Sequence, residues 1–341
     1  MGRVTSAEVA RAAGVSQSAV SRVFTSGAPV SVKTAERVRK AAGRLGYRPN
    51  ALARSLITGE SRIIGLAMAE LDNQFYPEIL KLLSCGLQES GYHILVFMAS
   101  GDDTETETVI SELLDYQVDA LIAASVALTT PLAERCRAQG IPVLLLNRHQ
   151  GNSGPPSVAS DNVGGARRMT EFLLRVGHER IAHISGWQGS STGRERRQGF
   201  LQALAAAGRS AAACVDGMFD QEIVRRITRE LFTAGDIRPD ALFVGSDNMA
   251  FAAMDVLRFE LGIRVPEEVS VTGFDDVPMA AWPAYSLTTM RQPLDKMIRE
   301  AVRHITGCIG NPSTEPPQIR LKCDLCVRGS SRPLSRMEEK K

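Results

Sequence analysis

From residue 62 onward, short and almost wholly apolar runs alternate with longer amphipathic segments. The apolar runs, predicted as strands, are RIIGLAMA, HILVFMA, VDALIAAS, IPVLLLN, RIAHIS, DALFVGS and VSVTGFD. The amphipathic segments, predicted as helices, lie at about 76–90, 104–116, 130–139, 162–176, 194–207, 220–234 and 248–261. Strands that are apolar along their whole length are buried on both faces, which is typical of parallel sheets covered by helices. The pattern occurs twice, so it predicts two α/β lobes with a cleft between them.

The segments that do not fit this alternation receive separate predictions. A weak strand is expected near 213–217, and a further helix at 291–307. The stretch SGPPSVAS is predicted to be a proline-rich crossing between the lobes. QIRLKCDLCV is predicted to be one last strand.

Length and composition exclude several classes of protein. The chain has 341 residues, and no run of 18 apolar residues that could span a bilayer, so no membrane partner is expected. The N-terminus lacks the apolar segment of a signal peptide. The six cysteines are few and scattered, which favours reduced thiols in the cytoplasm over a disulfide framework.

Positive charge is concentrated at the N-terminus. The first 60 residues hold ten lysines and arginines against three acidic residues, whereas the whole chain has a net charge of +2. A basic segment on a mildly acidic body predicts a polyanionic partner for the N-terminus alone.

Residues 1–46 show the local signals of three short helices. Thr5 and Glu8 have the spacing of a capping box, and Gly14 ends the first helix. Ser16 caps a second helix after the turn AGVS, and Ser31 caps a third. This is the pattern of a helix-turn-helix, although a small three-helix bundle with a solvated basic surface is the plainer interpretation.

The second helix carries the residues suited to reading DNA. Gln17, Ser18, Ser21 and Arg22 point away from the face that packs on the other helices. Gln and Arg side chains bond to base edges in the major groove, and Ser donates to bases or phosphates.

The stretch YRPNALARSLITG at 47–59 is too short to be a stable helix alone. Leu52 and Leu56 are four residues apart, so they share one helical face. The leucines serve either to pack against a partner or, in the plainer interpretation, to tuck into the core as part of a linker.

With these residues placed, the chain resembles the LacI/GalR family of bacterial transcription regulators along nearly its whole length. The motifs that carry the resemblance are VTSAEVARAAGVSQSAVSRVF, VRKAAGRLGYRPNALARSL, VLLLNR, SDNVGG, GHERIAHISG, RERRQGF, VGSDNMAFAAM and VSVTGFDD. The resemblance implies an all-α helix-turn-helix headpiece followed by a core like the periplasmic sugar-binding proteins. The expected parts are a headpiece at 1–47, a hinge helix and linker at 48–60, and a core at 61–341. Within the core, lobe one takes in about 61–160 and 292–322, and lobe two about 161–291 and 323–330.

The resemblance also implies how DNA is bound. Two hinge helices, residues 50–56 of each subunit of a homodimer, pair in the minor groove of a palindromic double-stranded operator, and Leu56 wedges apart the central base step. The DNA-binding residues expected on this basis are Thr5, Ser16, Gln17, Ser18, Ser21, Arg22, Asn50, Ala53 and Leu56.

A small-molecule effector is expected in the cleft, at the carboxyl ends of the strands. The candidate effector-binding residues are Phe75, Tyr76, Asn147, Arg148, Asp161, Arg196, Ser246, Asp247 and Asp275. Arg196 and Asp275 form a polar pair suited to polyols, and Arg148 with Arg196 would admit a sugar acid. Plainer roles are a helix cap for Asp161 and Asp247, a core position for Phe75, and an ion pair between the lobes for Arg148.

An enzymatic function is a weaker hypothesis than DNA binding. GSSTG matches a hydrolase nucleophile motif, with Asp275 and His304 downstream of Ser191. Ser191 is expected in a flexible loop and His304 within a helix, so no enzyme is predicted. No catalytic residue, metal ligand or cofactor is assigned, and CDLC is attributed to strand alternation.

The function expected is that of a transcriptional regulator, a repressor, whose operator binding is controlled by a sugar or sugar acid. The effector would change the angle between the lobes and so separate the hinge helices. A solute-binding protein would have the same core, but the basic headpiece argues against it.

Overall fold

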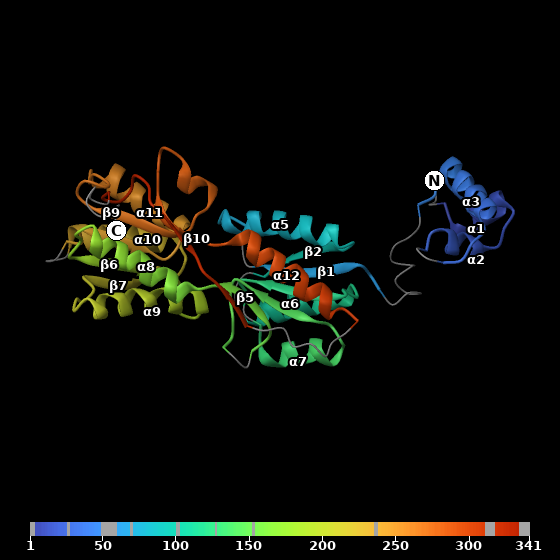
Figure 1. The fold of residues 1–341 in the computed structure, drawn as a ribbon, viewed down its shortest axis with the longest axis horizontal. Coiled ribbons are helices and arrows are strands. Elements are labelled where there is room, and N and C mark those ends of the chain that lie inside the picture. Colours follow the sequence, from blue (N-terminus) through green and yellow to red (C-terminus); the bar gives the residue numbers. More distant parts are fainter. Residues whose placement is uncertain are drawn as a thin grey trace, which may run out of the picture. The chain divides into compact units, whose positions relative to one another are not determined.

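The computed structural model describes residues 4–25, 28–48, 60–68, 71–99, 103–126, 128–151, 154–234, 238–310 and 318–333. The chain divides into two compact units, Met1–Arg62 and Ile63–Lys341, drawn in Figure 1. They are called the headpiece and the core below.

The headpiece is a three-helix unit, with helices α1 (Ser6–Ala13), α2 (Gln17–Val23) and α3 (Val32–Leu45). Its predicted capping signals are confirmed. The Thr5 amide donates to Glu8 Oε2 at 2.7 Å, and the Glu8 amide donates to Thr5 Oγ1 at 3.3 Å. Gly14 ends α1 in the left-handed conformation at φ 62°, which costs glycine no steric strain. The helices bury a core of small apolar side chains, mainly alanine and valine.

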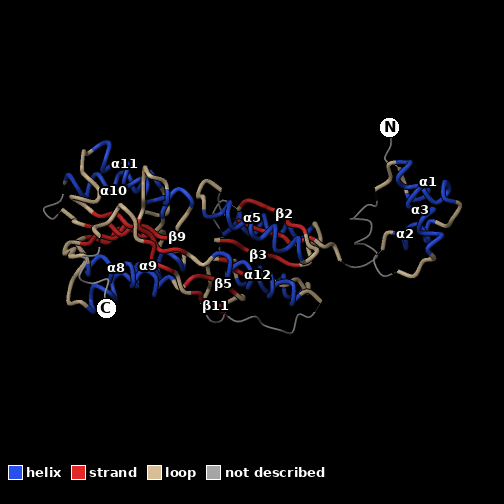
Figure 2. The backbone as a smooth tube through the Cα atoms, turned by 45° about the horizontal axis from the view of Figure 1, so that its top comes forward, coloured by secondary structure: helices blue, strands red, loops and turns tan. Residues whose placement is uncertain are grey.

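Lobe one of the core is built on a parallel six-stranded sheet in the order β11-β5-β4-β3-β1-β2. The strands are β1 (Ile63–Met68), β2 (His93–Met98), β3 (Ala120–Ala124), β4 (Val143–Leu146), β5 (Ser157–Ser160) and β11 (Gln318–Leu321). The helices of this lobe are α5 (Phe75–Glu89), α6 (Asp103–Asp115), α7 (Thr130–Ala138) and α12 (Leu294–Cys308). Helices lie on both faces of the sheet (Figure 2).

Lobe two has a second six-stranded sheet in the order β12-β10-β9-β8-β6-β7, in which β12 alone runs antiparallel to its neighbour. The strands are β6 (Ile181–Ser185), β7 (Ala213–Asp216), β8 (Ala241–Val244), β9 (Ser270–Asp275), β10 (Thr288–Arg291) and β12 (Asp324–Cys326). The helices are α8 (Asn162–Arg175), α9 (Ser191–Ala206), α10 (Gln221–Thr233) and α11 (Asp247–Asp255). A π-helical turn at Val256–Glu260 continues α11, and a 3-10 turn follows at Pro278–Ala281.

The strands are apolar throughout because each sheet is covered on both faces. In β3, Leu121 and Ala123 pack into the cluster under α6 and α7, whereas Ala120, Ile122 and Ala124 face the opposite cluster with α5 and α12. Successive side chains of a strand point to opposite faces, so both sets must be apolar when both faces are buried. The expected α/β core with an all-α headpiece is confirmed.

The chain passes between the two lobes three times. It crosses after β5 at residue 161, after β10 at residues 292–293, and after β11 at residues 322–323. Three neighbouring crossings permit rotation of one lobe against the other about a common hinge.

Four predictions about the elements were wrong, and one strand was not predicted. SGPPSVAS is not merely a crossing, because it contains β5, and β10 was not predicted at all. QIRLKCDLCV is divided into β11 and β12, which belong to different sheets. Helix α9 begins at Ser191, where Ser190 caps it. The helix predicted at 248–261 is not α-helical throughout, because α11 ends at Asp255 and a π-helical turn follows.

No helix in the described ranges is long and apolar enough to cross a membrane.

Two histidines lie inside lobe two. Burial lowers the pKa of His183 to about 4, although its bond to the Phe243 carbonyl opposes the shift. Its ring packs 4.9 Å from the Phe200 ring and 4.8 Å from the Phe243 ring. Burial, aided by the charge of Arg332, lowers the pKa of His178 to about 4 as well. Both rings are therefore neutral at physiological pH.

These histidines predict that the core loses stability in mild acid. The native pKa lies below the ordinary value of 6.5, so the unfolded state binds more protons between about pH 6.5 and 4. The contribution of the neutral histidines to the free energy of unfolding is fully present above pH 6.5 and is lost as the pH falls toward 4. His183→Phe removes one titrating group, so we expect the pH dependence of the urea-unfolding free energy to flatten by up to about 1.4 kcal/mol per pH unit. His93→Gln, on the exposed start of β2, is the control. An unchanged slope in His183→Phe would contradict the assignment.

Candidate functional site

The carboxyl ends of the strands in both lobes hold strained backbone. Asn147 after β4, Phe219 after β7 and Asp275 at the end of β9 have φ values of 69°, 61° and 128°. Non-glycine residues adopt positive φ uncommonly, and such residues cluster at functional sites. The same feature occurs at Ser125, Met218 and Asp276. The strained positions therefore mark the carboxyl ends of the strands in both lobes as the candidate site.

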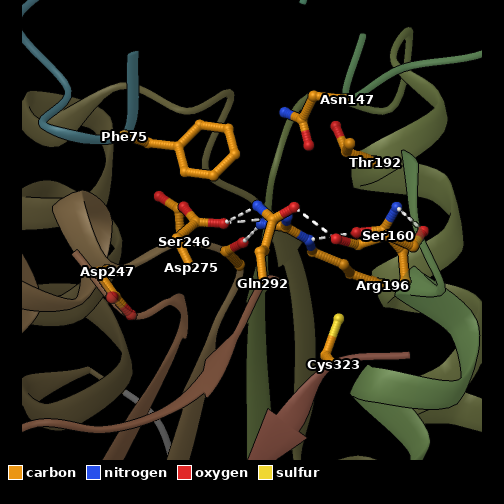
Figure 3. A network of polar contacts seen from close by, with 12 residues as sticks. Phe75, Asn147, Ser160, Thr192, Arg196, Ser246, Asp247, Asp275, Gln292 and Cys323 are labelled. Carbon is orange, nitrogen blue, oxygen red and sulfur yellow. Dashed lines mark hydrogen bonds and ion pairs between the residues drawn. The ribbon is translucent and has the colours of Figure 1, made fainter. Parts of the chain in front are cut away.

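The pair Arg196 and Asp275 forms the floor of this site (Figure 3). Arg196 Nη2 lies 3.1 Å from Asp275 Oδ1, and both side chains are almost fully buried. The guanidinium also donates from Nη1 to the Gly245 carbonyl at 2.6 Å and from Nε to Asn162 Oδ1 at 3.0 Å. Its carbon lies 3.7 Å from the centre of the Phe274 ring. Arg196 is thus held on all sides by lobe two.

Gln292 and Ser160 connect this pair to the crossings between lobes. Gln292 Nε2 donates to Asp275 Oδ1 at 2.7 Å, and Ser160 Oγ donates to Gln292 Oε1 at 2.6 Å. Gln292 lies in the second crossing, and Ser160 ends β5 just before the first. The carboxylate of Asp275 is therefore hydrogen-bonded to the hinge as well as to Arg196.

Asp247 and Asp275 have different roles despite their proximity. Burial and the charge of Asp275 raise the pKa of Asp247 to about 8. Burial raises the pKa of Asp275 too, but Arg196 and Gln292 act against that rise. Because the buried guanidinium needs a counter-charge, Asp275 is the ionised member and Asp247 holds the proton.

Asp247 anchors the loop after β9. It accepts a bond from the Val277 amide at 2.9 Å and one from Thr289 Oγ1 at 2.5 Å. Ser246, rather than Asp247, caps α11 through the Met249 amide. The predicted cap was therefore placed one residue too late.

The aromatic candidates Phe75 and Tyr76 begin α5 and are 2% and 6% exposed. Figure 3 shows the Phe75 ring facing the side chains of Asp275 and Gln292, and both aromatic residues belong to the main apolar cluster. Phe75 therefore occupies the core position that was its plainer role, and its contact with an effector stays a prediction.

The remaining candidates lie just after the carboxyl ends of β4 and β5. Asn147 donates from Nδ2 to Ser125 Oγ at 3.0 Å and lies opposite Thr192 (Figure 3). The Arg148 guanidinium lies 5.9 Å from the centre of the Trp187 ring. Asp161 accepts from the Gly164 amide at 2.9 Å, which is the helix-cap role.

The sequence reasoning missed several polar and aromatic residues at the site. Gln292 and Ser160 were missed because Gln292 directly follows β10 and Ser160 ends β5, and neither strand was predicted. Trp187 and Phe219 follow β6 and β7, and the position of each after a strand was a usable signal.

The arrangement of Ser191, Asp275 and His304 does not support a hydrolase. The prediction of a flexible loop for Ser191 was wrong, because it is the first residue of α9 and its Oγ accepts a bond from the His149 amide at 3.1 Å. Asp275 is bonded to Arg196 and Gln292, and His304 contacts Arg303 and Glu300 on α12.

A different serine–histidine–aspartate group lies in lobe two. His178 Nε2 is 2.7 Å from Ser270 Oγ, and its Nδ1 is 3.4 Å from Asp240 Oδ1. Ser270 is fully buried, and its Oγ also accepts a bond from the Arg332 amide. This group therefore ties the start of β9 to the segment after β12, and a substrate cannot reach the hydroxyl.

In the headpiece, the side chains of Gln17, Ser18, Ser21 and Arg22 are exposed on α2. Gln17 Nε2 donates to Ser6 Oγ at 2.8 Å, which fixes its position over α1. Thr5 and Ser16 serve as helix caps. The hinge candidates Asn50, Ala53 and Leu56 lie outside the described residues.

Comparison with known proteins identifies both units. Residues 5–50 match the model of the lacI family of bacterial regulatory proteins, and residues 170–331 match the periplasmic binding protein-like domain. The chain is 35% identical to the HTH-type transcriptional regulator CelR of Thermobifida fusca, covering 96% of this chain and 98% of CelR.

Solved structures give the same result. The lac repressor dimer bound to operator and an anti-inducer matches at a TM-score of 0.87 and 27% identity, over 97% of this chain and all of that one. A CelR–cellobiose complex matches at a TM-score of 0.72 and 34% identity, over 96% of this chain and all of that one. The chain belongs to the lacI family of bacterial regulatory proteins, and it is a transcriptional regulator with a helix-turn-helix headpiece.

Proposed function

We propose that this regulator is a homodimer that binds a palindromic operator through its headpieces and is controlled by a sugar in the cleft of the core. The observation that carries the proposal is the polar floor made by Asp275, Arg196 and Gln292 at the ends of the lobe-two strands. It lies against the hinge, so occupancy of the cleft can act on the angle between the lobes.

The chemistry of the cleft favours an uncharged sugar. Asp275 and Gln292 offer acceptors and donors to hydroxyl groups, and the Phe75 ring offers a flat apolar face to the C–H groups of a pyranose. Arg196 is already paired with Asp275, so its charge is not free for a sugar acid. A saccharide is also the ligand in the CelR–cellobiose complex.

The exposed face of α2 supports operator binding as the regulated activity. Arg22 and Gln17 carry the side chains that bond to guanine and adenine edges in the major groove. A headpiece with three short helices offers one such surface, so a palindromic operator requires two subunits.

The core offers apolar surface for a second copy of the chain. Phe259 is 82% exposed and Trp282 is 51% exposed, both in lobe two. In lobe one, a mostly apolar groove between α5 and the sheet-edge strand β2 is lined by Leu71, Pro77, Leu80, Lys81, Ser84, Ile94 and Val96. Exposed large apolar side chains of this kind mark association surfaces, and the similar lac repressor is a dimer.

A thermal-shift screen tests the sugar class. We expect at least one of cellobiose, glucose, galactose or ribose to raise the melting temperature by a few degrees, because a ligand that binds only the native state stabilises it by about 2.7 kcal/mol at a hundred times its Kd. Glucuronate and galacturonate should have no effect. A saturable response below about 10 mM separates binding from general stabilisation by excluded sugars. No response to any carbohydrate, or a response to the acids alone, would count against the proposal.

Selection from a library of random DNA duplexes tests the proposed binding to a palindromic operator. The wild-type protein should enrich a palindrome, and Arg22→Ala should lose about 1–3 kcal/mol of affinity and relax the preference at one symmetric pair of positions. Arg226→Ala, the same substitution on α10 of the core, is the control and should leave the enriched sequence unchanged. An Arg22→Ala protein with wild-type affinity and preference would exclude the assigned role.

A further inference from the structure

Residues 148–149, in the loop after β4, contact the other lobe at Trp187 and at the first turns of α9. His149 Nε2 lies 2.5 Å from Glu195 Oε1, and the His149 amide donates to Ser191 Oγ at 3.1 Å. The neighbouring Arg148 lies over the Trp187 ring. Lobe one is thus docked on lobe two through a histidine–carboxylate contact that neither the polar floor nor the crossings require.

The geometry fixes the roles of both partners. The Gly151 amide donates to His149 Nδ1 at 3.2 Å, so Nδ1 is an acceptor and Nε2 carries the proton given to Glu195. Burial would raise the pKa of Glu195, but the hydrogen bonds from His149 and Asn162, together with nearby positive charge, outweigh it and lower the pKa. The acceptor is therefore a carboxylate, and a charge-assisted bond is stronger than a neutral one.

The contact is shielded from water. The side chains of His149 and Glu195 are 16% and 20% exposed, whereas the surface pair Arg226 and Glu230 on α10 is 60% and 59% exposed. Exposed pairs contribute little to stability, and partly buried pairs are screened less by solvent and salt.

Glu195 is also joined to the effector site. Its Oε2 accepts a bond from Asn162 Nδ2 at 3.1 Å, and Asn162 Oδ1 accepts one from Arg196 Nε at 3.0 Å. A continuous series of hydrogen bonds therefore runs from His149 of lobe one to the Arg196–Asp275 pair.

We propose that the His149–Glu195 contact is a latch that holds the two lobes together when the cleft is empty, and so sets how readily the cleft accepts an effector. The proposal rests on the proposed function, in which the effector lies between the lobes. A ligand that touches both lobes favours the same approach of the lobes as the latch does. Weakening the latch should lower the fraction of molecules competent to bind, and the apparent affinity falls by the same factor.

A second contact between the lobes, on another part of the cleft, provides a remote reporter. The Met279 amide of lobe two donates to Gln74 Oε1 of lobe one at 3.1 Å. If the latch sets the distance between the lobes, breaking it must loosen this contact too. A purely local role would leave it unchanged.

Hydrogen–deuterium exchange on the full-length protein tests the latch without any effector. Glu195→Gln and His149→Ala should each speed exchange about fivefold or more in peptides covering 71–79 and 276–282, with β3 and β8 unchanged. The double variant should be no faster than either single one, because the two residues act as one contact. Glu230→Gln is the matched control and should exchange like the wild type.

The outcomes are distinguishable from failure of the proposed function. Faster exchange confined to 147–151 and 187–195, additive effects, or no change would overturn the latch. If Glu195→Gln also speeds exchange in β3 and β8, it has unfolded the core, and His149→Ala, in a loop, then decides the question. Cellobiose is added as a probe in a second arm. If it binds the wild type, the latch variants should bind it about fivefold or more weakly. If it does not bind, the exchange result still stands and only the choice of sugar fails.

Discussion

The buried ion pair between Arg196 and Asp275 is the interaction on which the cleft depends. Removing two charges from water costs several kcal/mol for each ion, and their attraction repays this only when the other donors and acceptors are satisfied. Here the Gly245 carbonyl, Asn162 and Gln292 supply those partners. The consequence is a rigid polar floor whose hydrogen bonds reach α8, α9, β9 and the second crossing. Burial, together with the charge of Asp275, raises the pKa of the nearby Asp247 and keeps it protonated. Of the two neighbouring carboxyl groups, Asp275 therefore serves as the ionised acceptor and Asp247 anchors the loop after β9.

Burial of both faces of each sheet explains why the core forms two lobes. The proposed regulation depends on the connections between these lobes. Both sheets are covered on two faces, so each lobe has apolar layers of its own. Three crossings, several polar contacts and one apolar cluster with members in both lobes connect the two. Rotation about these crossings breaks few apolar contacts inside either lobe. It does alter the contacts of Ser160, Gln292 and His149. The proposed effector site and the contacts that would respond to lobe rotation therefore share side chains, so occupancy of that site would act directly on the angle between the lobes.

Sequence signals predicted those parts of the fold that depend on interactions between residues a few positions apart. The Thr5–Glu8 capping box, the glycine that ends α1 and the acidic end of β9 were all readable, because cap geometry and strand apolarity are encoded within a few residues. The strands that were not predicted depend on pairing with strands that are distant in the sequence. Strand β5 consists of Ser157–Ser160 after two prolines, and only its pairing between β4 and β11 makes it a strand. Gln292 has no sequence signal of its own, and its role exists because β10 places it beside Asp275. The sequence likewise offered Asp161 and Asp247 as caps or ligands, and only the structure separates the cap at Asp161 from the loop anchor at Asp247.

The most direct measurement is the free energy of unfolding of Asp275→Asn in urea. Asparagine keeps an acceptor for Gln292 but removes the charge that balances Arg196, so the account predicts a loss of about 3–5 kcal/mol. Glu230→Gln, which removes one member of the exposed pair on α10, should change the value by no more than about 0.5 kcal/mol. If Asp275→Asn is as stable as that control, the buried pair does not organise the cleft and the central claim is contradicted.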